Sequence, residues 1–156
     1  MQLLLAGDVY SGDERHLEEL RNDIARAGLG ERVRLPGFCA EPQLVLAAAD
    51  VLVAPSTTAW PEGYGLAVVD ALCAGVPVIA SAHGGHLEIV RDGVDGLLVP
   101  PDDVDALAGA IRRMLDDADL RHAMARAALR DRTRFAMERG HQELWRIYDE
   151  VIGRSD

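Results

Sequence analysis

Two carboxylates, Glu62 and Asp70, flank a glycine-bearing turn and the start of an apolar helix, within residues 60–78, which read WPEGYGLAVVDALCAGVPV. Backbone N–H groups at a helix start favour anions such as phosphate, because they lack partners within the helix and the helix dipole is positive there. Gly63 and Gly65 carry no Cβ, so a ligand can approach this backbone closely. Carboxylates accept hydrogen bonds from sugar and ribose hydroxyls. The segment is therefore typical of a site for a nucleotide-sugar.

An acidic pair is usually an ordinary surface feature, but the neighbours of this pair argue against that interpretation. Asp70 interrupts the apolar run from Leu66 to Leu72, in a helix that we expect to be largely buried. A buried charge is costly unless it has a partner, so we predict a functional role for both carboxylates. Trp60 is expected to pack beneath its loop; stacking on a ligand is the alternative.

Short apolar runs alternate with helix patterns along the chain. Each run is continuous, as in parallel strands covered on both faces. Strands are expected at residues 2–6, 32–35, 51–54, 77–80 and 96–99, and helices at residues 17–24, 42–49, 66–74, 104–115 and from 120 onward. This alternation predicts an α/β fold, a Rossmann-like doubly wound parallel sheet of about five strands flanked by helices, with a helical C-terminus.

Ligands of such sheets bind in the loops beyond the carboxyl ends of the strands. These loops are expected at Gly7–Asp13, Pro36–Glu41, Pro55–Gly65 and Ser81–Glu88. The glycine turn falls in the third loop. Gly7 and Asp8 in the first loop are further candidates for ligand contact.

The fourth loop contains His83, Gly84, Gly85, His86 and Glu88. Metal binding is not expected there, because the two histidines lack the spacing of one helical turn and a third strong ligand. The glycine pair is expected to close over a ligand, with the glutamate capping the following helix. Contact of either histidine with a sugar or phosphate stays open.

Composition excludes several function classes. The net charge of −10 argues against nucleic acid and against a polybasic membrane patch, since both depend on clustered Lys and Arg. The N-terminus does not read as a signal peptide, and no run is apolar enough to span a bilayer. With only Cys39 and Cys73, we expect reduced thiols and a cytoplasmic location.

An apolar stripe marks the end of the chain, formed by Leu144, Trp145, Tyr148, Val151 and Ile152. It is interpreted as core or domain contact. A surface for a partner is the alternative.

Several motifs in order resemble retaining glycosyltransferases of family 4. They are the 60–78 segment with its GVPV strand entry, the glycine turn at 84–88, and residues 91–100, which read RDGVDGLLVP. The resemblance covers essentially the whole chain. The part of the family that the chain resembles is the carboxyl-terminal, donor-binding half of the GT-B fold. This resemblance implies that residues 1–156 form a single, partial donor-binding domain.

The resemblance implies a role for each matching residue. Glu62 is the catalytic residue and faces the donor hexose, while Asp70 binds the ribose. The remaining substrate-binding residues are the diphosphate-lining backbone of Gly63, Tyr64, Gly65 and Leu66, the base-bordering Gly37 and Phe38, and the facing turn of Gly84 and Gly85. The implied reaction transfers a sugar from a nucleotide-diphosphate sugar to a sugar, lipid or other hydroxyl acceptor with retention, and uses no cofactor and no metal.

Two departures from the family pattern set further expectations. Asp70 stands where the family normally has Glu, which shortens its reach. The chain also begins at what resembles the family's second strand, without the Arg and Lys of the preceding loop. We therefore expect a sheet with a gap or with re-paired strands, whose edges are prone to association.

The second departure also bears on activity and partners. We expect the chain alone not to be catalytically competent, with the acceptor bound through a missing N-terminal domain. Residues 120–153 are expected to pack toward that domain, and self-association or pairing with an N-terminal half is expected. A full-length form is compatible with a peripheral position at the inner membrane.

Two other function classes remain open from the sequence. One is a non-catalytic nucleotide-sugar-binding or assembly module. The other is a GT-B-like nucleotide-sugar epimerase, which should not need a carboxylate pair at the helix start.

Overall fold

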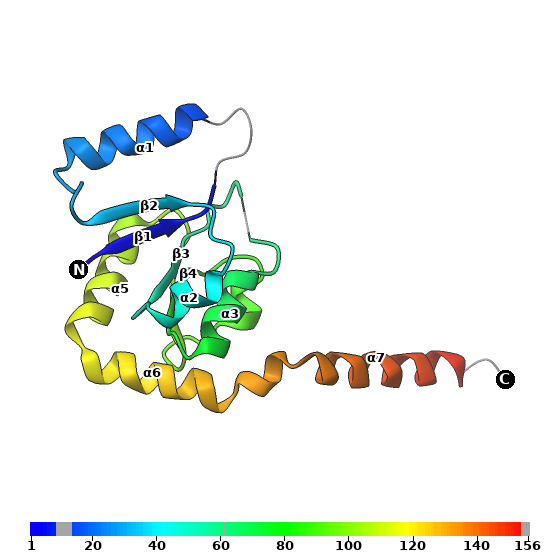
Figure 1. Ribbon diagram of the computed structural model, residues 1–156. Coiled ribbons are helices and arrows are strands. Elements are labelled where there is room, and N and C mark those ends of the chain that lie inside the picture. Colours follow the sequence, from blue (N-terminus) through cyan, green and yellow to red (C-terminus); the bar gives the residue numbers. More distant parts are fainter. Residues whose placement is uncertain (9–13, 61, 154–156) are drawn as a thin grey trace. The chain divides into compact units, whose positions relative to one another are not determined.

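The computed structural model describes residues 1–8, 14–60 and 62–153. The backbone forms two compact units, residues 1–42 and 43–156, and each is described by itself. The described residues contain five strands in parallel sheets, with flanking helices and a helical C-terminus (Figure 1). The predicted α/β class is confirmed.

The first unit is a parallel strand pair with one helix. It contains β1 (Leu3–Ala6), α1 (Glu14–Arg26) and β2 (Val33–Gly37), and Leu3 of β1 pairs with Val33 of β2. The prediction that β1 is covered on both faces is wrong, because its leucines are exposed. A two-stranded sheet with a single helix has too few layers to bury both faces of a strand.

The second unit holds the other elements. They are α2 (Pro42–Ala47), β3 (Leu52–Ala54), α3 (Leu66–Ala74), β4 (Val78–Ser81), α4 (His86–Ile89), β5 (Gly96–Val99), α5 (Val104–Asp116), α6 (Ala118–Arg130), the 3-10 helix η1 (Arg132–Phe135) and α7 (Met137–Ile152). The strands pair in the order β3-β4-β5, all parallel.

The central strand β4 is buried on both faces, as its continuous apolar run predicts. Val78 and Ala80 pack into a cluster with Leu72 of α3, whereas Ile79 packs into a second cluster with Met114 of α5. Alternate side chains of a strand point to opposite faces, so α3 and α5 cover opposite sides of this sheet.

Among the described residues, β1 pairs with β2, and β3 pairs with β4. The expectation of a gap or of re-paired strands stays a prediction.

Some helix boundaries differ from those predicted. Helix α4 begins at His86 with Gly85 as its N-cap, so Glu88 lies inside the helix and does not cap it. Helix α6 begins at Ala118, because the side chain of Asp117 accepts a hydrogen bond from the N–H of Leu120.

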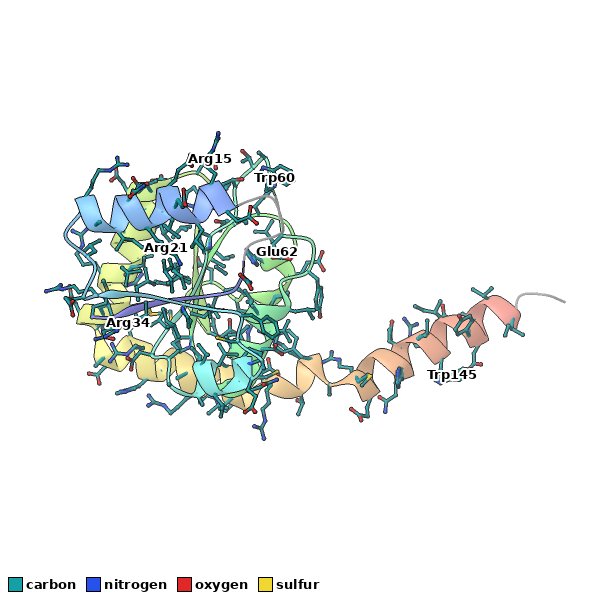
Figure 2. All side chains as sticks on the ribbon, turned by 45° about the horizontal axis from the view of Figure 1, so that its top comes forward. Arg15, Arg21, Arg34, Trp60, Glu62 and Trp145 are labelled. Atoms are coloured by element: carbon teal, nitrogen blue, oxygen red, sulfur yellow. The ribbon has the colours of Figure 1, made fainter. Side chains whose placement is uncertain are left out.

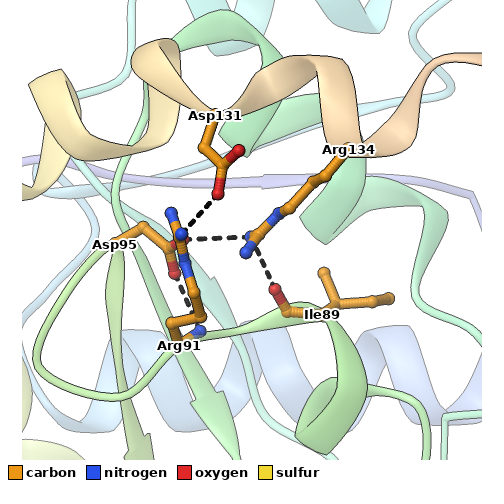
Figure 3. A network of polar contacts seen from close by, with 5 residues as sticks. All are labelled: Ile89, Arg91, Asp95, Asp131 and Arg134. Atoms are coloured by element: carbon orange, nitrogen blue, oxygen red, sulfur yellow. Dashed lines mark hydrogen bonds and ion pairs between the residues drawn. The ribbon is translucent and has the colours of Figure 1, made fainter.

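An ion-pair network centred on the buried Asp95 joins the β4–β5 connection to η1 (Figure 3). The side chain of Asp95 is fully buried and accepts hydrogen bonds from Nε of Arg91 at 2.8 Å and from Nη2 of Arg134 at 3.0 Å. Arg134 also donates to the carbonyl of Ile89, and Arg91 pairs with Asp131. The hydrogen bond from Arg91 to Asp95 raises the pKa of the guanidinium.

Helix α7, all of whose residues are described, contains no buried residue. The interpretation of its apolar stripe as core is therefore wrong, because Trp145, Tyr148 and Ile152 are exposed. In the part of the chain that the structure describes, no helix combines the length and apolarity needed to cross a membrane.

Candidate functional site

Two turns at the carboxyl ends of β3 and β4 lie directly against each other. The N–H of Gly85 donates to the carbonyl of Glu62 at 3.0 Å. A Cβ at Gly85 would lie 2.7 Å from the carbonyl oxygens of Gly63 and Tyr64, and a Cβ at Gly84 would overlap the carbonyl of Glu62. Only glycine permits this backbone approach, so the two turns are in direct backbone contact.

The carboxylate of Glu62 stands at the start of α3. Its Oε1 accepts a hydrogen bond from the N–H of Gly65 at 3.2 Å, and Gly65 is the N-cap of the helix, with φ of 85°. A Cβ on Gly65 would lie 3.1 Å from the ring of His86. The carboxylate therefore already bonds to the helix start, where anions are favoured.

His86 supports this turn from beneath. Its side chain is buried, and Nδ1 lies 3.1 Å from the carbonyl oxygen of Ser81 at the end of β4. The sequence left open whether this histidine contacts a sugar or phosphate. The structure gives it a packing role below Gly65 instead.

Asp70 does not lie in the buried position that the sequence predicts. The buried residues of α3 are Val68, Ala71 and Leu72, whereas Asp70 is exposed. It lies about 200° around the helix from Val68, given 3.6 residues per turn. The helix is buried on one side only, so no burial penalty applies to this carboxylate. A role in binding must rest on its position one turn from the helix start.

The rest of the glycine turn is open to solvent. Glu62, Gly63, Tyr64 and Leu66 are exposed, and Pro61 lies outside the described residues. Trp60 is 82% exposed, so the expectation that it packs under its loop is wrong (Figure 2). An exposed indole two positions before an exposed carboxylate in the sequence keeps ligand stacking available.

In the first unit, the other candidates also come together. The N–H of Gly7 donates to the carbonyl of Gly37 at 3.0 Å, which joins the loop after β1 to the end of β2. The neighbours of this pair, Asp8 and Phe38, are exposed, with Phe38 at 75%. Residues 9–13 of the first loop lie outside the described residues.

One contact near the site could not be predicted from the sequence. Oδ2 of Asp102, in the turn after β5, accepts hydrogen bonds from the N–H of Thr58 at 3.1 Å and from its hydroxyl at 2.6 Å. The two residues are 44 positions apart. Reasoning from local spacing could not pair them.

No group of three His, Cys, Asp or Glu side chains is arranged to hold a metal ion within residues 1–8, 14–60 and 62–153. What the site offers is a helix start, glycine backbone, two exposed carboxylates and an exposed indole. This arrangement can bind a phosphate through backbone N–H groups and hydroxyls through carboxylate oxygens.

Comparison with known proteins places these features in a family. A family model described as glycosyl transferases group 1 matches residues 1–131. A D-inositol 3-phosphate glycosyltransferase of Salinispora tropica is 36% identical over 96% of the chain, and an exopolysaccharide phosphotransferase of Streptomyces coelicolor is 36% identical over 93%. The chain spans only 31% and 15% of these relatives, respectively.

Solved structures agree. The crystal structure of Anabaena HepE in complex with UDP matches with a TM-score of 0.89 and 30% identity, over 96% of this chain and 41% of that one. The sucrose-phosphate synthase of Thermosynechococcus elongatus matches with a TM-score of 0.82 and 33% identity, over 99% of this chain and 39% of that one. HepE was also crystallised with UDP-glucose.

Proposed function

Because the chain belongs to the glycosyl transferases group 1 family, we propose that it is the donor-binding part of a retaining glycosyltransferase. The reaction moves a sugar from a nucleotide-diphosphate sugar to the hydroxyl of a sugar, lipid or other acceptor. We propose that this transfer needs no metal and no other cofactor. The free thiols of Cys39 and Cys73 agree with the cytoplasmic location that we also propose.

The observation that carries the proposal is the contact between the two glycine turns. The Gly84–Gly85 turn holds the backbone of Glu62 at the start of α3, where a diphosphate is favoured. We propose that Glu62 accepts hydrogen bonds from the donor hexose and that Asp70, one turn further along α3, accepts them from the ribose. The backbone from Gly63 to Leu66 then lies along the diphosphate.

In the first unit, we propose that Gly37 and Phe38 border the base and that Gly7 and Asp8 belong to the same ligand loops. The exposed ring of Phe38 offers an apolar face of the kind on which a base stacks. HepE, with 30% identity, was crystallised with UDP, so uridine nucleotides are the first ligands to test.

The two carboxylates have separable effects on binding. Glu62→Ala is expected to weaken UDP-glucose binding about tenfold, as for one lost hydrogen bond to a charged group, and to leave UDP binding unchanged. Asp70→Ala is expected to weaken both ligands about tenfold, because both contain the ribose. Isothermal titration calorimetry of the 156-residue chain measures these constants.

Two variants serve as controls for this experiment. Glu62→Gln keeps an acceptor for the N–H of Gly65, so it separates loss of charge from loss of the contact at the helix start. Asp116→Ala removes an exposed carboxylate at the end of α5 and should bind like the parent. Equal affinity of parent, Glu62→Ala and Asp70→Ala for UDP-glucose would contradict the proposal, as would a folded parent that binds no nucleotide.

The exposed face of α7 favours a second function, as an assembly surface. Trp145 and Tyr148 lie with ring centroids 6.1 Å apart, and both are exposed, as is Ile152. Exposed apolar faces of this kind mark contact sites. We propose that the C-terminal helices, residues 120–153, pack toward an acceptor-binding domain, and that in the 156-residue chain the same face binds a second copy.

Sedimentation equilibrium tests this surface. The parent chain is expected to form a concentration-dependent dimer, and Trp145→Glu is expected to weaken dimerisation at least about tenfold by placing a charge in the apolar contact. Glu150→Gln, on the polar side of α7 next to Arg146, is the matched control and should dimerise like the parent. A parent that remains monomeric at all concentrations would rule out binding of a second copy by this face.

A further inference from the structure

The loop that leads from β3 to Glu62 has few anchors. Within residues 55–60, the N–H of Ser56 donates to the hydroxyl of Ser81 at 2.9 Å, and the N–H of Trp60 donates back to Thr57 inside the same loop. Thr58 is connected to the rest of its unit by two hydrogen bonds to Asp102, as far as the described residues show.

An open groove of about 270 Å³ lies beside this loop. It is lined by residues of the loop, which include Ser56 and Thr57, and by residues of the turn after β5, which include Pro100 and Asp102. A loop that borders an open groove makes fewer van der Waals contacts than one packed on a core. The hydrogen bonds between Thr58 and Asp102 therefore contribute to its position.

The backbone of Asp102 is unusual. With φ of 61°, it is the only residue other than glycine in the left-handed region among those that the structure describes. This conformation is unfavourable for a residue with a Cβ, although Asp tolerates it better than most. Glycine would fit this backbone better, so the presence of Asp here points to a role for its side chain.

The neighbouring residue already performs the ordinary task of an aspartate at this place. Asp103 is the N-cap of α5, and its Oδ1 accepts the N–H of Ala106 at 2.8 Å. Asp102 is therefore not needed to cap the helix, and both hydrogen bonds that the structure gives its carboxylate are with Thr58. These hydrogen bonds lower the pKa of Asp102, which favours the charged, accepting form.

We propose that Asp102 is a positioning residue for the donor site: by holding Thr58, its carboxylate fixes the part of the loop that presents Trp60, whereas Glu62 is held by the Gly84–Gly85 turn. This inference rests on the proposed function for its effect on binding. The tether itself is a property of the chain without ligand, and it can be measured separately.

The loop can be observed directly, because the chain has two tryptophans, Trp60 and Trp145. In a Trp145→Phe background, fluorescence anisotropy and iodide quenching report the mobility of Trp60 alone. Asp102→Gly removes the tether and is expected to lower the anisotropy, while the midpoint of thermal unfolding stays the same or rises because the backbone strain is relieved. Thr58→Val should have the same effect on anisotropy.

Binding is measured on the same variants without the Phe substitution. Asp102→Gly and Thr58→Val are each expected to weaken UDP-glucose binding about tenfold, since the loop must be ordered on binding. The double variant should be no weaker than either single one, because both remove the same interaction. Asp102→Asn, which keeps an acceptor oxygen, should restore most of the anisotropy and affinity.

Each outcome has a defined meaning. Unchanged Trp60 anisotropy in Asp102→Gly would overturn the tether, and reduced anisotropy with parental UDP-glucose affinity would overturn the positioning role. A parent that binds no nucleotide would refute the proposed function and the positioning role together, while the anisotropy would still decide whether Asp102 holds the loop.

Discussion

Replacing Asp95 by Ala is expected to lower the free energy of unfolding by about 3–5 kcal/mol, the usual cost of breaking a buried ion pair from one side. The carboxylate accepts from the backbone N–H and Nε of Arg91 and from Nη2 of Arg134, and it is fully buried. Arg91 is partly exposed and can be rehydrated. Arg134, whose side chain is only 17% exposed, would be left with an uncompensated charge.

Urea unfolding followed by circular dichroism measures this loss. Asp131→Ala is the matched control, because its carboxylate pairs with Arg91 in the same network but is 47% exposed, and such pairs contribute about 1 kcal/mol or less. Asp95→Asn keeps the shape and one acceptor, so it should fall between the two. A loss below about 1 kcal/mol in Asp95→Ala would mean that the network contributes little to the stability of its unit.

Local pattern predicted the strands but not how much of each is covered. The runs at residues 77–80 and 96–99 read as buried parallel strands, and β4 and β5 are buried. The run at residues 2–6 has the same pattern, yet β1 is exposed. The apolar composition of a segment indicates that it can form a buried strand. How many strands and helices cover it depends on its pairing with other segments, which its own residues do not determine.

Helix α3 shows a related limit. Its sequence is so apolar that its outer side, which carries Leu66 and Asp70, cannot be told from its inner side, which carries Val68 and Leu72. The predicted burial of Asp70 is therefore wrong, although the boundaries of the helix were predicted correctly. The glycine turn was predictable because its chemistry is local: a carboxylate, small residues and a helix start are adjacent in sequence.

Contacts between distant segments could not be predicted from the sequence. Asp95 meets Arg134 across 39 positions, and Thr58 meets Asp102 across 44. In a chain with 26 acidic and 16 basic residues, spacing alone does not select such partners. These long-range pairs nevertheless support the turns that local chemistry identifies.

The largest effect on binding is expected from the facing glycines. Gly85 has an ordinary φ of −61°, so Gly85→Ala changes only the close approach, placing a Cβ 2.7 Å from the carbonyl oxygens of the opposite turn. The turn that carries Glu62 must then move. Since this turn carries both Glu62 and the backbone that we propose lies along the diphosphate, we expect Gly85→Ala to weaken UDP-glucose binding more than the about tenfold expected for Glu62→Ala. Gly84→Ala, which adds a left-handed φ of 56°, should be at least as severe.

Two other glycines of the same unit serve as controls that distinguish the effect of a close backbone approach from the effect of backbone strain. Gly93 has φ of 73°, and an added methyl group there would meet nothing within 4 Å, so Gly93→Ala should cost stability, about 1 kcal/mol, without loss of affinity. Gly109 lies inside α5 with free space around it, and Gly109→Ala should stabilise the helix by about 0.5–1 kcal/mol. Calorimetric titration and thermal unfolding of all four variants give both quantities. If the affinity for UDP-glucose followed stability across the four variants, the facing turns would be only a structural feature. If the affinity falls only in the Gly84 and Gly85 variants, the contact between the two turns sets the geometry of the donor site.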